Sequence, residues 1–319
     1  MRFVVATHGH CFDGLASAVL FTRLIQARGG SDIHFTYRAC GYGAGQLRAD
    51  DSILDGDENA ILDYRYHPSD RLTWYFDHHR TAFANTEDQA HFEARRSGGQ
   101  FFFDATASSC TKLIAHIARD QFGVEDALLG ELVTWADRID SARFESAAHA
   151  VDRSSSVMQL ASVVEYYGND AFVTRLVPEL LKRPLAEVAA LPEVKQRYLP
   201  LGKKHDDFVA RVRTSSRRLG RVVYVDLTEE VLEGVGKFVT YALFPDSVYS
   251  VVVGLLKNGP KISVGYNPWS GRPLDTDISS ICARYGGGGH PVVGGIAFAS
   301  TEVDRARAVA RQIADELMG

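Results

Sequence analysis

The sequence WYFDHH, residues 74–79, joins three aromatic side chains to an acid and two histidines. The aromatic run is typical of a buried strand in a parallel sheet, and such sheets place ligand sites just beyond the carboxyl ends of their strands. A single histidine there would usually be a core residue. Three consecutive titratable groups are costly to bury unless a metal, hydrogen bonds or a substrate compensate them, so Asp77, His78 and His79 predict a functional site.

Other predicted strands end in similar residues. The first leads into a loop that contains His8 and Asp13, and the third ends at Asp63. Because the carboxyl ends of parallel strands meet at one edge of a sheet, we expect these side chains to lie beside residues 77–79. Taken alone, Asp13 is equally consistent with a cap on the helix that follows it.

Strands and helices are predicted to alternate over the first half of the chain. The expected strands cover residues 2–6, 33–39, 59–62, 74–76 and 100–103, and the expected helices cover 15–25, 106–118 and 126–140. This alternation predicts an α/β domain with a mostly parallel sheet and flanking helices. The loop GYGAG, residues 41–45, lacks the lysine and the spacing of a Walker motif, so we interpret it as a flexible connection.

The last of these helices ends in WADRID, residues 135–140. Asp137 follows an apolar run, so its carboxylate is expected to be partly buried and to need a partner, which favours a functional role. Asp140 is equally consistent with a solvated helix face, where ion pairs contribute little stability. Arg138 is a candidate for binding a substrate anion.

Length, charge and cysteine content limit the class of protein. A chain of 319 residues predicts two domains. Its 35 basic and 40 acidic side chains give a formal net charge of −5, so no global field attracts long nucleic acid, and an anionic substrate must be held locally. Four cysteines at unrelated spacings indicate a reducing compartment. No signal-peptide or membrane-spanning pattern is recognisable, so we expect a soluble cytoplasmic protein.

A change of composition marks the predicted domain boundary. Helix-like periodicity continues through residues 157–181, and residues 203–218 are strongly basic. No aromatic platform is interleaved with these charges, so a solvated connecting helix is preferred over a nucleic-acid patch. We expect a metal-binding catalytic domain over 1–190, a helical connector over 191–218 and a smaller α/β substrate-binding domain over 219–319.

The second domain is predicted from strand signals. Strands are expected over 221–225, 248–256 and 261–266, with a hairpin turn at Asn258-Gly259 and a helix over 278–285. Arg272 and Asn267 are candidates for binding phosphate. Trp269 and Tyr266 are at least as consistent with packing as with stacking on a base.

A run of four glycines, Gly286, Gly287, Gly288 and Gly289, precedes His290. Each glycine costs roughly 0.5–1 kcal/mol relative to alanine in regular structure, so the run needs a reason. A plain linker would not be followed at once by a histidine and an apolar strand. The run therefore indicates a backbone that approaches a phosphate closely.

Together these motifs resemble the DHH phosphoesterase superfamily, in its two-domain form with the DHH-associated C-terminal domain. The resemblance covers most of the chain. The motifs that carry it are HGHCFDG (8–14), LDYRY (62–66), DHH (77–79), WADRID (135–140) and YGGGGHPVVGG (285–295). Within the superfamily, the chain resembles oligoribonuclease and bisphosphate-nucleotide phosphatase members. The resemblance implies an active site in the cleft between the domains.

The resemblance also implies metal ions and residue roles. Family members bind a divalent ion, usually Mn²⁺, with Mg²⁺ or Co²⁺ as substitutes, and carboxylates with imidazole suit such ions better than Zn²⁺. Asp63 would bridge two ions and His8 would hold one of them. The ligands implied for the other ion are Asp13, His78 and Asp137. Asp77 would orient the ring of His78 and His79 would face the phosphate, so Asp63, Asp77 and His79 are the expected catalytic residues.

The opening motif departs from the family pattern. Cys11 stands where the first aspartate is expected, which leaves the position at His8 short of a carboxylate. Three alternatives stay open: a weak ion position, one completed by Cys11 or His10, or one filled only when substrate is bound.

The predicted function is hydrolysis of a small phosphorylated substrate by a metal-activated hydroxide. The expected substrates are short oligonucleotides, linear dinucleotides or a nucleoside bisphosphate, because a slightly acidic chain lacks the extended basic groove of a processive exonuclease. Neither a membrane nor long duplex nucleic acid is an expected partner, and a homodimer is left open. The alternatives are a pyrophosphatase or exopolyphosphatase, and a non-catalytic nucleotide sensor.

Overall fold

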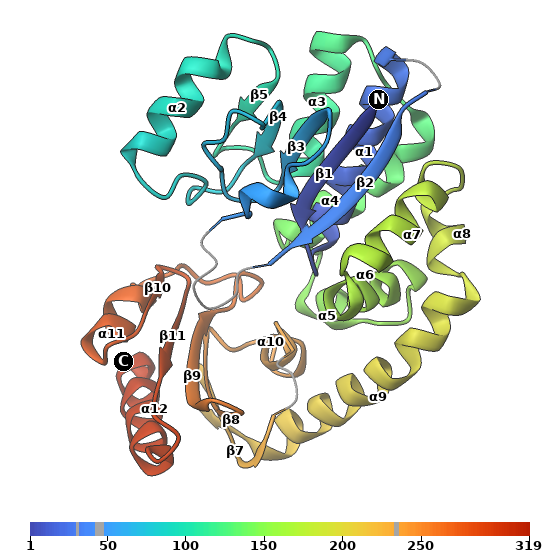
Figure 1. Ribbon diagram of the computed structural model, residues 1–319. Helices are drawn as coiled ribbons and strands as arrows, with labels where there is room; N and C mark the ends of the chain where they lie inside the picture. The colour runs from blue at the N-terminus through green and yellow to red at the C-terminus, as the bar shows by residue number, and fades with distance from the viewer. Residues whose placement is uncertain (30–31, 42–47, 233–235) are drawn as a thin grey trace. The chain divides into compact units, whose positions relative to one another are not determined.

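A computed structural model describes residues 1–29, 32–41, 48–232 and 236–319 (Figure 1). The chain divides into two compact units, unit 1 (Met1–Arg143 and Arg153–Leu199) and unit 2 (Phe144–Asp152 and Pro200–Gly319). The relative placement of the units is not defined, so the cleft expected between them stays a prediction. The loop expected over 41–45 lies, apart from Gly41, outside the described residues.

Unit 1 contains a five-stranded sheet in the order β2-β1-β3-β4-β5, and every pairing in it is parallel. The strands are β1 (Arg2–His8), β2 (His34–Cys40), β3 (Glu58–Leu62), β4 (Trp74–Asp77) and β5 (Phe101–Phe103). Thr7 at the end of β1 lies opposite Leu62 at the end of β3. Their next residues, His8 and Asp63, therefore emerge side by side, and the expected mostly parallel sheet is confirmed.

Both faces of this sheet are covered, which explains the unbroken apolar run in β4. Trp74 and Phe76 contact the ring of Phe21, which lies in a helix on one face. Tyr75, which points the other way, contacts Phe92 from a helix on the opposite face. The helices of unit 1 are α1 (Phe12–Gly29), α2 (Thr86–Arg96), α3 (Cys110–Phe122), α4 (Gly130–Asp140), α6 (Ser156–Tyr167), α7 (Asp170–Leu180) and α8 (Leu185–Ala189), with 3₁₀ turns at Asp51–Ile53 and Ala127–Leu129.

Helix α1 starts earlier than expected, at Phe12, because the chain turns directly from β1 into it. A Cβ on Gly14 would lie 2.1 Å from the carbonyl oxygen of His8, so only glycine lets the helix approach the strand this closely. Thr7 donates a hydrogen bond of 2.6 Å from its hydroxyl to the Gly14 carbonyl oxygen, which fixes the approach. The first turn of α1 is thereby held at the end of β1.

Unit 2 contains a six-stranded mixed sheet in the order β10-β11-β9-β8-β7-β6. Only the β7–β8 pairing is parallel, and β8 and β9 form the expected hairpin, with Leu256 opposite Gly259. Its elements are β6 (Ser216–Leu219), β7 (Val222–Val231), β8 (Tyr249–Leu256), β9 (Gly259–Tyr266), β10 (Gly288–His290), β11 (Val293–Ala297), α5 (Ala147–Val151), α10 (Val239–Leu243), α11 (Ile278–Arg284) and α12 (Val303–Met318). Helix α9 (Pro192–Ser215) belongs to both units. Among the described residues, no helix has the length and apolarity needed to cross a membrane.

Candidate active site

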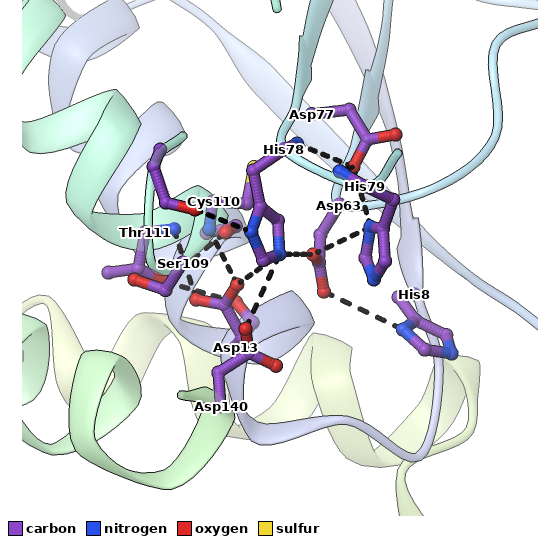
Figure 2. Close-up of polar contacts among 12 residues, drawn as sticks. His8, Asp13, Asp63, Asp77, His78, His79, Ser109, Cys110, Thr111 and Asp140 are labelled. Carbon is purple, nitrogen blue, oxygen red and sulfur yellow. Dashed lines mark hydrogen bonds and ion pairs between the residues drawn. The ribbon is translucent and has the colours of Figure 1, made fainter. Parts of the chain in front are cut away.

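The carboxyl edge of the unit 1 sheet gathers acids and imidazoles (Figure 2). His8 ends β1, Asp63 follows β3, and Asp77 ends β4, with His78 and His79 after it. These strands are neighbours in the sheet although the ends of β1 and β4, at His8 and Asp77, are 69 residues apart in the chain. The topology alone therefore brings the predicted cluster together.

Asp63 is at the centre of the cluster and is fully buried. Its two carboxylate oxygens have no hydrogen-bond partner. They lie 3.6 Å from His8 Nδ1 and from His78 Nε2, and 3.8 Å from His79 Nδ1. Burial acts to raise the pKa of Asp63, but these imidazoles outweigh it and lower the pKa to about 2. The φ of 55° is a left-handed conformation that aspartate and asparagine tolerate better than other residues with side chains.

His78 presents its Nε2 atom to three carboxylates. Its Nδ1 lies 3.1 Å from the carbonyl oxygen of Ala107, which can only accept, so the proton is assigned to Nδ1. Nε2 then lies 3.4 Å from Asp140 Oδ2, 3.6 Å from Asp63 Oδ1 and 3.9 Å from Asp13 Oδ2. Burial acts to lower the pKa of His78, but Asp63 and Asp140 outweigh it and raise the pKa to about 9. Loss of the Nε2 proton would leave a lone pair directed towards the acids, as in a metal ligand.

Asp13 caps a helix, but not the one in which it lies. Its carboxylate accepts hydrogen bonds from the backbone amides of Cys110 (2.7 Å) and Thr111 (3.0 Å) at the start of α3. Burial and the charge of Asp63 raise its pKa well above the usual range. The capping role and the place beside His78 therefore hold together, and a cation there would stabilise the charged form.

Asp77 orients His79, whereas the resemblance implied that it orients His78. Its Oδ1 accepts a 2.7 Å hydrogen bond from His79 Nδ1 as well as bonds from two backbone amides, and its Oδ2 accepts one from the Tyr75 hydroxyl. The hydrogen bond to Asp77 raises the pKa of His79. Because the Ala107 carbonyl orients His78, the role of Asp77 is corrected to that of holding the ring of His79.

Asp140, rather than Asp137, faces the cluster. Asp137 accepts a hydrogen bond from Ser108 and pairs with Lys112 at 2.9 Å, so its carboxylate is engaged away from the cluster. Burial acts to raise the pKa of Asp137, but these two partners lower it. Asp140, one helical turn later, faces His78. The helical period offered a signal for Asp140. Residues three apart are neighbours on a helix surface, so a helix that brings Asp137 near the site also brings Asp140 near it.

Cys11 belongs to a second group of possible ligands. One ligand atom each of His8, Cys11 and Asp63 lies within 4.8 Å of the other two. His10, the other residue considered for this position, is turned away. Its backbone N–H donates to the Gly168 carbonyl oxygen, and its Nδ1 lies 3.1 Å from the carbonyl oxygen of Glu165.

The residues of unit 1 fit a divalent cation. Three sets have suitable atoms within 4.8 Å: His8 with Cys11 and Asp63, Asp63 with His78 and His79, and Asp13 with His78 and Asp140. A buried carboxylate without hydrogen bonds costs several kcal/mol unless a cation compensates it. Oxygen and imidazole donors suit ions such as Mn²⁺, Mg²⁺ or Co²⁺. The Asp63 oxygens, which make no hydrogen bond, could therefore hold an ion at this edge.

The glycine run in unit 2 is largely explained by folding. Gly286 has a φ of 77° at the end of α11. A Cβ on Gly287 or on Gly289 would lie 2.3 or 2.2 Å from a carbonyl oxygen of β11. Gly288, by contrast, has no described atom within 4 Å of an added Cβ, and His290, two residues later in β10, is exposed. Of the four glycines, Gly288 is the one for which folding supplies no reason.

Other substrate-binding candidates differ from expectation. Asn267 is fully buried and donates hydrogen bonds to the carbonyl oxygens of Pro245 and Ser247, so the sequence-based role is wrong and the residue is structural. Trp269 donates to the Phe144 carbonyl oxygen, which supports packing rather than base stacking. Arg272 is exposed, and the guanidinium of Arg138 lies over the Trp135 ring at 5.0 Å. Both arginines remain candidates.

Comparisons with known proteins identify the fold. A scan of family models and a search of curated proteins find no match. Among solved structures, the chain is similar to PggH, a pGpG-specific phosphodiesterase from Vibrio cholerae, with 22% identity and a TM-score of 0.68 over 100% of this chain and 99% of that one. RecJ from Thermus thermophilus in complex with Mn²⁺ matches with 13% identity and a TM-score of 0.57, over 99% of this chain and 52% of RecJ. An exopolyphosphatase-related protein from Bacteroides fragilis matches with 11% identity and a TM-score of 0.51, over 99% of this chain and 92% of that one.

These neighbours are DHH-domain proteins. The chain has the DHH fold. This fold covers the described chain from end to end, so the fold predicted from the five motifs is confirmed. In the DHH fold of this chain, the Asp77-His78-His79 sequence ends β4, directly beside the turn that carries Asp63.

Proposed function

We propose that the protein is a divalent-metal-dependent phosphoesterase that hydrolyses small phosphorylated substrates. The observation that carries this proposal is the buried Asp63 carboxylate, whose oxygens lack hydrogen bonds and face three imidazoles. The match to a phosphodiesterase along nearly the whole of both chains supports it. A protein that only binds nucleotides has no need of so many converging ion ligands.

The proposed ligand set is Asp13, Asp63, His78 and Asp140, with Asp140 in place of Asp137. Asp63 would bridge this position and a second one at His8. When bound, a divalent ion supplies Lewis-acid chemistry to a phosphoryl group and lowers the pKa of a water molecule. We propose Mn²⁺ for the Asp13 position, because its donors are oxygen and imidazole.

His79 is proposed to contact the phosphate. Its Nδ1 is occupied by Asp77, so Nε2 is the atom left to meet a substrate, and 32% of the side chain is exposed. The raised pKa of His79 favours a ring that donates a proton or a hydrogen bond to a phosphoryl oxygen. Asp77 would act through His79 as a positioning residue.

We propose a short 5′-phosphorylated oligonucleotide as substrate, and first a linear dinucleotide such as pGpG, the substrate in the name of the Vibrio protein. The test is an Mn²⁺-supplemented hydrolysis panel of pGpG, a longer oligonucleotide, adenosine 3′,5′-bisphosphate, pyrophosphate and a cyclic dinucleotide. Release of mononucleotides that slows with length is the expected result. No turnover of any substrate by the folded, metal-loaded protein would favour a nucleotide sensor.

Phosphoanhydride hydrolysis is the second candidate. It is supported by the similarity to an exopolyphosphatase-related protein, whose name states no nucleotide. Preference for pyrophosphate in the same panel would select it. We propose that the protein is located in the cytoplasm, and its four free cysteines support this location. Whether the protein forms a homodimer is tested by its molar mass in solution, measured by light scattering.

Gly288 and Gly287 form a matched pair for testing the glycine run. Gly288→Ala adds a methyl group where no described atom lies within 4 Å, so we expect unchanged stability. Turnover should fall by about 10- to 200-fold, the usual effect of one misplaced methyl group in a substrate pocket. Gly287→Ala should instead destabilise unit 2 by about 1–3 kcal/mol, because its Cβ would meet a carbonyl oxygen at 2.3 Å. Normal kinetics of a stable Gly288→Ala protein would remove this loop from substrate binding.

Asp77→Asn separates the two roles considered for Asp77. We expect turnover to fall by about 10- to 100-fold while Mn²⁺ affinity is preserved, because Asp77 holds His79 and the Ala107 carbonyl holds His78. Turnover and calorimetric Mn²⁺ affinity are measured on the same preparation. The opposite pattern, weak Mn²⁺ binding with normal turnover at saturating metal, would show that Asp77 orients His78 instead.

A further inference from the structure

The ligand set on the β1 side of Asp63 differs in chemistry from the other two. It consists of an imidazole from His8, a thiol from Cys11 and the carboxylate of Asp63, each with one atom within 4.8 Å of the others. The two sets that include His78 contain no sulfur. Asp63 is fully buried and neither of its carboxylate oxygens makes a hydrogen bond, so it points to an ion independently of the cysteine.

Local structure holds Cys11 in this position. The amide of Gly9 donates a 2.6 Å hydrogen bond to the Cys40 carbonyl oxygen at the end of β2, and the amide of His10 donates one of 3.0 Å to Gly168. His10 has a φ of 57°, a left-handed conformation that turns the chain just before Cys11. The Cys11 carbonyl oxygen then accepts the first backbone bond of α1 from Leu15. The loop is fixed on both sides of Cys11, so its sulfur is a preformed donor.

We infer that the His8 position is a thiolate site that selects Zn²⁺ or Co²⁺ over Mg²⁺ and Mn²⁺. This inference deepens the proposed function and rests on it, because it names the class of ion for one of the two metal positions. Nitrogen, sulfur and oxygen from three side chains form the donor set of an open zinc-type site, with a position left for water or substrate. Thiolates favour Zn²⁺ and Co²⁺, whereas carboxylates suit Mg²⁺ and Mn²⁺. The protein would then hold two unlike ions with Asp63 between them.

The binding step is balanced by one proton. The Cys11 thiol loses its proton to solvent as the sulfur–metal bond forms, and the ion exchanges water for the thiolate. The thiolate carries the same charge as the aspartate expected at this place. A Cys11→Asp variant therefore keeps the charge and changes only the softness of the donor.

Cobalt provides a direct test that does not depend on turnover. Co²⁺ titrated into the metal-free protein should produce a near-ultraviolet sulfur-to-cobalt charge-transfer band. Cys11→Ser should abolish the band and weaken Co²⁺ binding at this position by at least about 100-fold, since loss of a direct ligand exceeds the effect of loss of its outer partners. Cys11→Asp should also abolish the band, because its donor atom is oxygen. Cys40→Ser changes a buried cysteine at the end of the neighbouring strand β2 and is the matched control. This variant should keep the charge-transfer band. A wild-type protein without the band, or a band that survives Cys11→Ser, overturns the inference.

Alkylation of the native wild-type chain supplies a second readout. Cys11 is partly exposed, whereas Cys40, Cys110 and Cys282 are buried, so iodoacetamide should modify Cys11 first. Zn²⁺ should block the modification and Mg²⁺ should not; equal rates with the two ions would contradict the thiolate site. If the band appears and no phosphoester is hydrolysed, the inference stands and the proposed function fails. If phosphoester is hydrolysed and the band is absent, the proposed function stands and the inference fails.

Discussion

Asp63→Asn is expected to remove metal-dependent hydrolysis almost completely, by at least about 10³-fold, equivalent to about 4 kcal/mol in the barrier. The carboxylate belongs to two of the three sets of possible ligands, one with His8 and one with His78, so its charge would serve both proposed positions. Asparagine accepts the left-handed backbone at this residue, where φ is 55°, so the fold should be retained. In the metal-free state the variant should be somewhat less stable than the wild type at neutral pH, because the imidazoles that lower the pKa of Asp63 to about 2 lose a charged partner.

Two measurements check this result together. The first is Mn²⁺-dependent turnover of bis-p-nitrophenyl phosphate. The second is the shift of Tm on addition of Mn²⁺, which should be large for the wild type and lost in the variant, because only bound metal stabilises the folded state. Asp70→Asn makes the same chemical change at an exposed residue and should alter neither. An Asp63→Asn protein with near-normal turnover would remove the bridging role.

Asp140→Asn is expected to lower Mn²⁺ affinity by at least about 100-fold, whereas Asp137→Asn should change it by less than about tenfold. Asp140 Oδ2 lies 3.4 Å from His78 Nε2, and burial together with the charge of Asp63 raises its pKa, as expected for an acid that lacks a cation. Asp137 is already paired with Lys112 at 2.9 Å. Its loss should cost only up to about 1 kcal/mol of stability, because the ion pair is partly exposed.

Calorimetric titration with Mn²⁺ and thermal unfolding distinguish the two acids. The variants lie in the same helix, three residues apart, and make the same chemical change, so each serves as the control for the other. Weak metal binding by Asp137→Asn with normal binding by Asp140→Asn would restore the ligand set that the resemblance implied.

The parts of the site that sequence predicts well are those fixed by the sheet. A strand has a period of two and a defined end, and parallel strands share one edge, so the acids and imidazoles that follow β1, β3 and β4 must converge. The left-handed turn at Asp63 was not predicted, although it decides where the carboxylate points. Aspartate tolerates that conformation without requiring it, so the residue type alone carries little information.

The parts that failed depend on side-chain direction within helices and loops. Asp137 and Asp140 are one turn apart, and only the rotation of α4 against α3 determines which one faces His78. Asn267 lies near the glycine run in sequence, but its amide bridges two carbonyl oxygens in a turn. Segment 144–152, expected in the first domain, belongs to unit 2, where the partly buried Val151 packs against a core cluster. Tertiary packing, which no local pattern encodes, decided each case.

The cap that Asp13 places on α3 makes that helix sensitive to whatever binds at the sheet edge. One carboxylate faces His78 and also accepts the first two amides of α3, so an ion that polarises it alters the strength of both backbone bonds. Occupancy of the site and fraying of the first turn of α3 are then linked equilibria, and linkage acts in both directions. A substitution that loosens α3 far from any ligand would lower the affinity for the ion. Hydrogen exchange at the amides of Cys110 and Thr111 would report the fraying of the helix.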